Sequence, residues 1–217
     1  MSLFSPSLVG ALGALAVAAG LVGANAPPPP AAETPAASPV GQPQYDDKGR
    51  LLPPAGYRDW VFLSSGLDMS YSDPPTPVDA HMFDNVFAPP AAYAAFRRDG
   101  VWPDKTVLVL EIRGGASKGS INKRGAFQSG DPMGVETHVK DTARFKGGWA
   151  FFGFDGALSG PSTQIPYAAA CYSCHEAHAA ADTTFVQFYP TLLPVATRLK
   201  TLNPRYLSDP DPVVPGT

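Results

Sequence analysis

Only two cysteines occur in the 217 residues of this chain, and both lie within the stretch ACYSCHEAH. Cys171 and Cys174 are separated by two residues, and His175 follows the second cysteine directly. Cys-x-x-Cys-His is the attachment sequence of c-type haem. On one turn of helix the two thiols can add to the two vinyl groups of a porphyrin, and the adjacent imidazole then lies under the iron. The motif therefore predicts a helix around the cysteines and one covalently bound haem c, with His175 as the proximal iron ligand.

Three other kinds of site can be built from closely spaced cysteines. A disulfide needs no histidine behind it, and a bridge over so short a loop stabilises little through chain entropy. A zinc site needs more ligands, but the chain has no second cysteine pair, and His81, His138 and His178 are scattered. A thioredoxin-like redox pair needs a βαβ context, whereas the preceding SGPSTQIPYAAA has the composition of a loop. We therefore favour haem over all three.

The amino-terminal residues predict export from the cytoplasm. An uncharged apolar run ends in Ala24-Asn25-Ala26, the small-x-small pattern that signal peptidase accepts, so residues 1–26 are expected to be a signal peptide. The leader has no Lys or Arg, and Pro27 follows the expected cut, so a nearby cut or an uncleaved membrane anchor stays open as an alternative. A cleaved signal and a periplasmic protein are the favoured interpretation.

Composition divides the rest of the chain. Residues 27–44 are mostly Pro, Ala and Ser, which favours an extended tether over a packed segment. The haem domain is expected over 45–202, followed by a flexible tail over 203–217. Sixteen Lys and Arg against nineteen Asp and Glu give a net charge of -3 without a basic block, so nucleic acid is not an expected partner.

Short strands separated by turn-rich segments make up most of the expected domain. A helical turn leads into a strand near Trp60, and a second strand is expected over 82–87. Runs rich in β-branched and aromatic residues predict buried strands over 107–112 and in GGWAFFGFDG. The Gly- and Ser-rich stretch between them, 114–141, is expected to be a long hairpin connection.

Helices are expected at two places only. One is residues 91–98, where Tyr93 and Phe96 are at helical spacing and Gly100 is a natural stop, and the other surrounds the cysteines. These elements predict an α+β fold, with an antiparallel β-sheet packed with a few helices in a single haem-binding domain.

No residue stands out as a sixth iron ligand. His178 lies one helical turn from His175 and stays on the proximal side. Glu136 and His138 either form a polar pocket edge or belong to a solvated strand face. We therefore expect a five-coordinate iron. The side chains that could bind iron by their chemistry alone are His81, His138, Met69, Met82 and Met133.

Three stretches resemble the cytochrome P460 family of exported c-type haem proteins, and the resemblance extends from Asp46 to Leu193. They are DDKGRLLPPAGYRDWV, VETHVKDTARFKGGWAFFGF and CYSCHEAHAAADTTFVQFYPTL. The resemblance implies an antiparallel sheet with a few helices, a homodimer, and a five-coordinate haem whose distal side faces sheet residues. It also implies that Cys171 and Cys174 form the thioether bonds and that His175 is the proximal ligand.

The chain departs from the family pattern at two positions. Defining members oxidise hydroxylamine and use a lysine crosslinked to the haem, and Leu110 stands where that lysine would be. Lys105 lies five residues before it, in the turn. Asp84 stands where family members carry an arginine, whereas Glu136 matches a glutamate of the distal pocket.

The first functional hypothesis is therefore an exported mono-haem protein with open iron. It would bind nitric oxide or a similar small ligand in a pocket shaped by Leu110 and Phe83. The alternative is a haem oxidoreductase acting on hydroxylamine or a similar nitrogen species, with Glu136 as a catalytic proton relay. A second alternative is an electron-transfer cytochrome, which would favour a strong sixth ligand.

Overall fold

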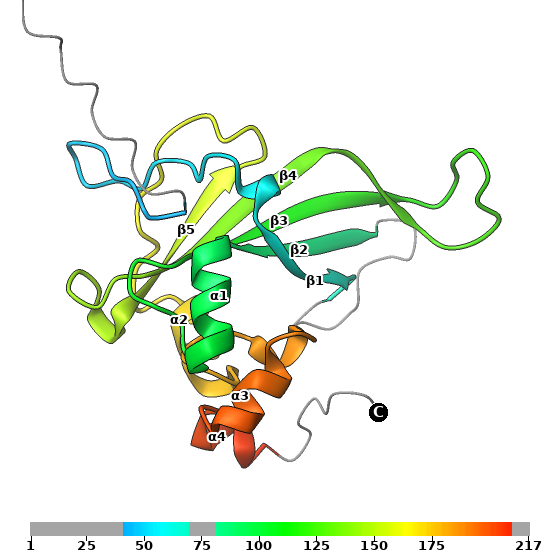
Figure 1. Cartoon of the computed structure of the whole chain (residues 1–217). Helices are drawn as coiled ribbons and strands as arrows, with labels where there is room; N and C mark the ends of the chain where they lie inside the picture. The colour runs from blue at the N-terminus through cyan, green and yellow to red at the C-terminus, as the bar shows by residue number, and fades with distance from the viewer. Residues whose placement is uncertain (1–40, 70–80, 210–217) are drawn as a thin grey trace, which may run out of the picture. The chain divides into compact units, whose positions relative to one another are not determined.

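Five strands form one open antiparallel sheet in a computed structural model that describes residues 41–69 and 81–209 (Figure 1). The spatial order β1-β2-β3-β4-β5 is the order along the chain, so each strand pairs with its sequence neighbours. This sheet, with helices packed on it, confirms the expected α+β fold. The strands are β1 (Val61–Leu67), β2 (Met82–Ala88), β3 (Val107–Ala116), β4 (Phe127–Lys140) and β5 (Trp149–Asp155).

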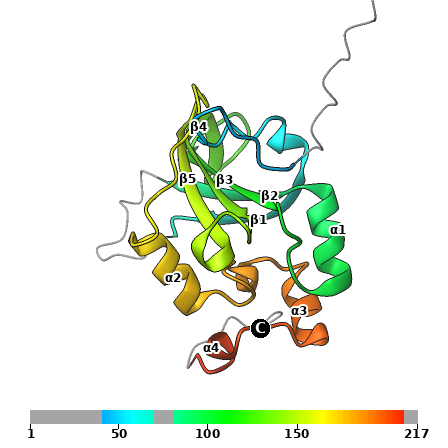
Figure 2. The ribbon, with the colours of Figure 1, turned by 90° about the vertical axis from the view of Figure 1, so that its left-hand side faces the viewer.

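The helices lie together on one side of this sheet (Figures 1 and 2). Pro90 opens the first of them at the position where a missing N–H costs nothing, and Gly100 ends it with a φ of 74°. None of the helices in the described part of the chain is long and apolar enough to cross a membrane. They are α1 (Pro90–Asp99), α2 (Ala170–His178), α3 (Leu193–Leu199) and α4 (Pro204–Leu207), with 3-10 turns η1 (Tyr57–Asp59), η2 (Lys146–Gly148) and η3 (Val186–Phe188).

The two faces of the sheet carry different cores, because successive residues of a strand point to opposite faces. We call the face covered by the helices the helix face, and the face covered by residues 41–60 the N-terminal face. The helix face carries Asp84, Val86, Leu108, Leu110, Glu136, His138, Trp149 and Phe151. The N-terminal face carries Asn85, Phe87, Val107, Val109, Glu111, Val135, Val139 and Phe152.

The expected hairpin connection over 114–141 is wrong in its second half. Residues Phe127–Lys140 form β4, the longest strand, which pairs with both β3 and β5. Val135, Thr137 and Val139 alternate toward the N-terminal face and are buried there. This alternation stabilises a strand although the start of β4 is rich in Gly and polar residues.

The domain also extends beyond the expected boundaries. Tyr206 of α4 is buried in the same core as the helices, and Asn203 donates hydrogen bonds to the carbonyls of Ala179 and Asp182. The expected flexible tail is therefore wrong for residues 203–209. At the other end, Leu52 donates a backbone hydrogen bond to Gln44, so the last residues of the expected tether join the domain. The expected signal peptide lies outside the described residues.

Candidate functional site

Helix α2 brings the two cysteines and His175 to one side. At about 100° per residue, Cys171, Cys174 and His175 project within one half of the helix circumference. Tyr172 lies outside this half of the circumference, is buried, and donates a hydrogen bond to the carbonyl of Gly147 at 3.3 Å. Cys171 is exposed, Cys174 is partly exposed, and the two are not joined in a disulfide. Both thiols are thus free to react on the side of α2 that Tyr172 leaves open.

His175 is held in the form that binds a metal. Its Nδ1 lies 2.8 Å from the carbonyl oxygen of Thr183, which can only accept, so Nδ1 carries the proton and Nε2 keeps its lone pair. Burial lowers the pKa of His175, although the Thr183 carbonyl acts in the opposite direction. The imidazole is therefore neutral at physiological pH.

Three aromatic rings enclose the imidazole of His175. The centroid of its ring lies 4.1 Å from that of Phe185, 4.7 Å from that of Phe151 and 5.0 Å from that of His138. His138 is itself buried and stacks on Phe151 with ring centroids 4.1 Å apart. His138 is therefore a direct neighbour of His175. The expectation that His138 belongs to a solvated strand face is wrong, and its place beside His175 does not fit a ligand on the opposite side of the iron.

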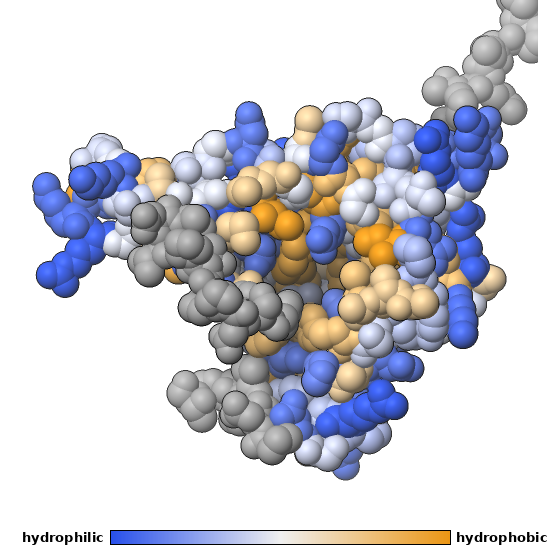
Figure 3. All heavy atoms as spheres, turned by 180° about the vertical axis from the view of Figure 1, so that it is seen from behind, coloured by the Kyte–Doolittle hydropathy of each residue, from blue (hydrophilic) through white to orange (hydrophobic). Residues whose placement is uncertain are grey.

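Leu110 and Glu136 lie directly opposite each other on β3 and β4, on the helix face. Asp84 of β2 lies on the same face, and its charge acts on Glu136. The pKa of Glu136 is raised first by partial desolvation and then by Asp84, and the pKa of Asp84 is raised by desolvation and by Asp68. Figure 3 shows a hollow between the sheet and the helices in which apolar side chains gather. The helix face of the sheet thus offers an apolar surface with two carboxyls, Asp84 and Glu136, whose pKa values lie above those of ordinary carboxyls.

Phe83 does not share this surface. It is the strand neighbour of Asp84 and pairs with Arg113 and Leu67, so it lies on the N-terminal face. The expectation that Phe83 shapes a pocket together with Leu110 is wrong, because residues 83 and 110 differ in strand parity across a regular register.

The other candidate ligands are placed in several different ways. His81 is paired through Nδ1 with the carboxylate of Asp68 at 2.6 Å. His178 is exposed on α2, and the large apolar side chains of Met69 and Met133 are exposed as well. Met82 begins β2 and pairs with Gly114.

Lys105 forms an ion pair that does not involve the Leu110 position. Its Nζ pairs with the buried carboxylate of Asp141 at 2.5 Å.

A family comparison identifies the chain's relatives. Residues 54–186, well over half of the 217, match the family model of cytochrome P460. The chain belongs to the cytochrome P460 family. Membership makes it a cytochrome that carries haem c with iron. No curated protein matches the sequence in a second comparison.

The residues of this cytochrome P460 family member fit a haem. A neutral histidine keeps Nε2 free, two unpaired thiols stand within one turn of it, and an apolar hollow lies beside the helices. These are the donor set and the surroundings that a c-type haem needs. Bound there, the group would supply an iron centre, while Cys171, Cys174 and His175 would hold it and the sheet and helices would shape the pocket.

Thr183, Phe151 and Phe185 were not anticipated as site residues. Phe151 could have been found, because alternation in WAFFGF places it on the same face as Trp149. Thr183 and Phe185 reach His175 only because the loop after α2 folds back, and no spacing in the sequence indicates that return.

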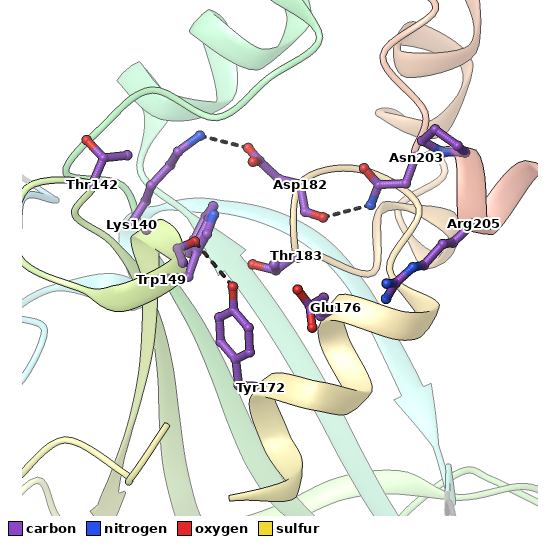
Figure 4. A pocket seen from close by; sticks show the side chains of 12 residues that line it. Lys140, Thr142, Trp149, Tyr172, Glu176, Asp182, Thr183, Asn203 and Arg205 are labelled. Carbon is purple, nitrogen blue, oxygen red and sulfur yellow. Dashed lines mark hydrogen bonds and ion pairs between the residues drawn. The ribbon is translucent and has the colours of Figure 1, made fainter. Parts of the chain in front are cut away.

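A separate cleft of about 610 Å³ lies on the other side of α2 (Figure 4). Tyr172 and Glu176 reach it from α2, on the side away from the cysteines. Lys140 and Asp182 are paired at its edge at 2.8 Å, so its charges are partly neutralised within the protein. Thr183 and Trp149 also line it, which places the loop after α2 between this cleft and His175.

Proposed function

We propose that this protein is an exported mono-haem cytochrome whose open iron binds a small nitrogen-oxide ligand such as nitric oxide. Cys171 and Cys174 hold the haem through thioether bonds, and Nε2 of His175 is the proximal ligand. The observation that carries this proposal is the composition of β3 on the helix face. Leu108, Leu110 and Ile112 occupy its positions there, and none of them has an atom that binds iron.

The surroundings suit an uncharged ligand. An apolar surface favours a neutral diatomic molecule over a hydrated anion. Asp84 and Glu136 add negative charge, or protons when they are neutral, and the raised pKa of Glu136 lets its carboxyl keep a proton to a higher pH than an ordinary glutamate does.

A haem oxidoreductase acting on hydroxylamine is the second candidate. Glu136 supports it, because its raised pKa suits a proton acceptor. Leu110 argues against it, because leucine cannot form the lysine–haem crosslink that the resemblance implies for hydroxylamine-oxidising members.

We also infer that the protein acts in the periplasm as a homodimer, after removal of a signal peptide. The uncharged apolar leader supports export, and the family resemblance supports the dimer. Light scattering on a chain lacking residues 1–40 tests the dimer, and a stable monomer at micromolar concentration contradicts it.

One preparation tests haem attachment and open iron together. The full chain is produced with a c-type maturation system, and its intact mass should show one covalent haem. Cys171→Ser and Cys174→Ser should each reduce the fraction of chains that carry the haem covalently. The ferrous protein should have a high-spin spectrum that changes on addition of nitric oxide. A sharp low-spin ferrous spectrum, unchanged by nitric oxide, would overturn the open-iron proposal, and rapid hydroxylamine turnover would favour the second candidate.

A further inference from the structure

Thr183 joins two histidines through two different atoms. Its carbonyl oxygen accepts the hydrogen bond from Nδ1 of His175 at 2.8 Å. Its hydroxyl oxygen lies 3.3 Å from Nε2 of His138. One residue of the loop after α2 therefore links the proximal histidine to a buried side chain of β4.

His138 is held by the sheet. Its ring stacks on Phe151 at 4.1 Å with an interplanar angle of 12°, and packs against Trp149 at 4.3 Å. Both partners are residues of β5, which pairs directly with β4. The ring of His138 also contacts that of His175 edge-on, with centroids 5.0 Å apart. Because three aromatic rings pack against it, the His138 side chain has little freedom to move. It can therefore hold the Thr183 hydroxyl, which its Nε2 contacts, in one position.

The loop that carries Thr183 is anchored on its outer side as well. The carboxylate of Asp182 accepts a hydrogen bond from Nζ of Lys140 at 2.8 Å, and its carbonyl accepts one from Asn203 at 2.7 Å (Figure 4). Asn203 donates a second hydrogen bond, also of 2.7 Å, to the carbonyl of Ala179. These contacts fix the backbone on either side of Thr183 from the cleft. Only the contact with His138 fixes the Thr183 side chain from the interior, among the hydrogen bonds of the described residues.

We propose that His138 is a positioning residue for the proximal ligand. Through the Thr183 hydroxyl and its edge contact with His175, it keeps the Thr183 carbonyl aligned with Nδ1 and fixes the rotation of the imidazole. A strong hydrogen bond at Nδ1 raises the basicity of a metal-bound histidine, which strengthens its bond to iron and stabilises the ferric state. The proposal rests on the proposed function in one respect, that Nε2 of His175 binds a haem iron with an open opposite side.

Four variants of the full-length holoprotein test the proposal. His138→Phe keeps an aromatic ring in the stack and removes Nε2, and Thr183→Val removes the hydroxyl while keeping the carbonyl and the branched side chain. Thr183→Ser keeps the hydroxyl and is the conservative rescue. His178→Phe makes the same exchange as His138→Phe at an exposed histidine of α2 and is the control.

The first two readouts are the iron–histidine stretching band of the ligand-free ferrous protein and the reduction potential. His138→Phe and Thr183→Val should lower the band frequency and raise the potential, while Thr183→Ser and His178→Phe should match the wild type. In the nitric oxide complex, the ratio of six-coordinate to five-coordinate iron should fall about tenfold in the first two variants, because a less basic histidine is displaced more readily. A double variant that combines His138→Phe and Thr183→Val should shift the band and the potential no further than either single change, since both changes remove the same contact.

Wild-type band and potential in both His138→Phe and Thr183→Val would overturn the proposal. Should His138→Phe fail to fold, the Thr183→Val and Thr183→Ser pair decides it alone. A low-spin wild type would reject the open-iron function, yet the potentials would still test the positioning role, so the two failures are distinguishable.

Discussion

The two faces of the sheet treat their carboxylates in opposite ways. On the N-terminal face, Glu111 is 2% exposed and accepts hydrogen bonds from Tyr57, Arg58 and Arg113 at 2.5 to 2.8 Å. On the helix face, the side-chain carboxyl of Glu136 accepts no hydrogen bond from any of the described residues, and its neighbour Asp84 adds like charge. One face pairs its carboxylate within the protein, and the other leaves its carboxyl to the solvent.

The pKa directions follow from this difference. Burial alone would raise the pKa of Glu111, but hydrogen bonds from Arg113, Tyr57 and Arg58 outweigh it and lower the pKa. Desolvation and Asp84 both raise the pKa of Glu136. A carboxyl whose pKa is raised on folding costs stability once it is ionised, and such groups are often found where a ligand or a proton is handled. The N-terminal face therefore stabilises the fold, and the helix face keeps groups suited to function.

The same truncation on each face gives the largest contrast. Glu111→Ala leaves Arg58, Arg113 and Tyr57 facing a buried gap, so it should lower the free energy of unfolding by about 3–5 kcal/mol. Glu136→Ala removes a carboxyl without hydrogen-bond partners among the described residues and should change that free energy far less. Urea unfolding of the two variants at neutral pH measures both values, and equal losses would contradict the division between the faces.

The Leu110→Lys variant tests whether residue 110 lies next to a small molecule bound to the iron. The new amine would face Glu136 and lie near Asp84, so it should stay protonated rather than become a neutral nucleophile. We expect the ferric Leu110→Lys variant to bind azide about tenfold more tightly, through one favourable charge in a partly exposed site. The matched control is Leu67→Lys, the same exchange at an exposed residue of the N-terminal face. Equal azide affinity in both variants would place Leu110 away from the ligand.

The pH dependence of stability should have opposite signs on the two faces. The pKa of Glu111 is lower in the folded chain, so its contribution is present above the unfolded pKa and is lost as the pH falls through the folded value. The pKa of Glu136 is higher in the folded chain, so stability decreases as the pH rises from the unfolded value to the folded one.

Glutamine variants measure these two contributions. The deficit of Glu111→Gln relative to the wild type should shrink toward acid pH. Glu136→Gln should instead become more stable relative to the wild type as the pH rises. The gain should be less than about 1 kcal/mol, because solvent screens the exposed carboxyl of Glu136 in the wild type. Thermal unfolding across the acid range records both differences, and parallel pH profiles would refute the opposite signs.

Local patterns in the sequence predicted the parts of the molecule that local chemistry determines. The haem motif, the helix at 91–98 and the strand at 107–112 each depend on neighbouring residues, and α1 and β3 lie at these places. β4 was missed because its strand character comes from pairing with β3 and β5, which overrides the weak propensity of Gly and polar residues.

Side-chain direction was the weakest part of the prediction. Phe83 and Asp84 are adjacent in sequence, yet only Asp84 lies on the helix face, and the register that decides this is set by β3. The link between His138, Thr183 and His175 spans three elements. A spacing rule within one segment cannot reveal it, because the contact depends on how the loop after α2 returns to the sheet.

Asp84→Asn should have the smallest effect of these variants, and it tests whether Asp84 and Glu136 interact on the helix face. Removing this charge removes the second cause of the raised pKa of Glu136, so that pKa should move downward while desolvation still holds it above its ordinary value. The protonated-carboxyl infrared band that Glu136→Gln abolishes reports the titration, and its midpoint should shift to lower pH. Asp131→Asn, which neutralises an exposed carboxylate at the start of β4, is the control and should leave the midpoint unchanged. If both variants shift the band equally, Glu136 responds to net charge alone, and the two carboxyls do not act as a pair at the edge of the hollow.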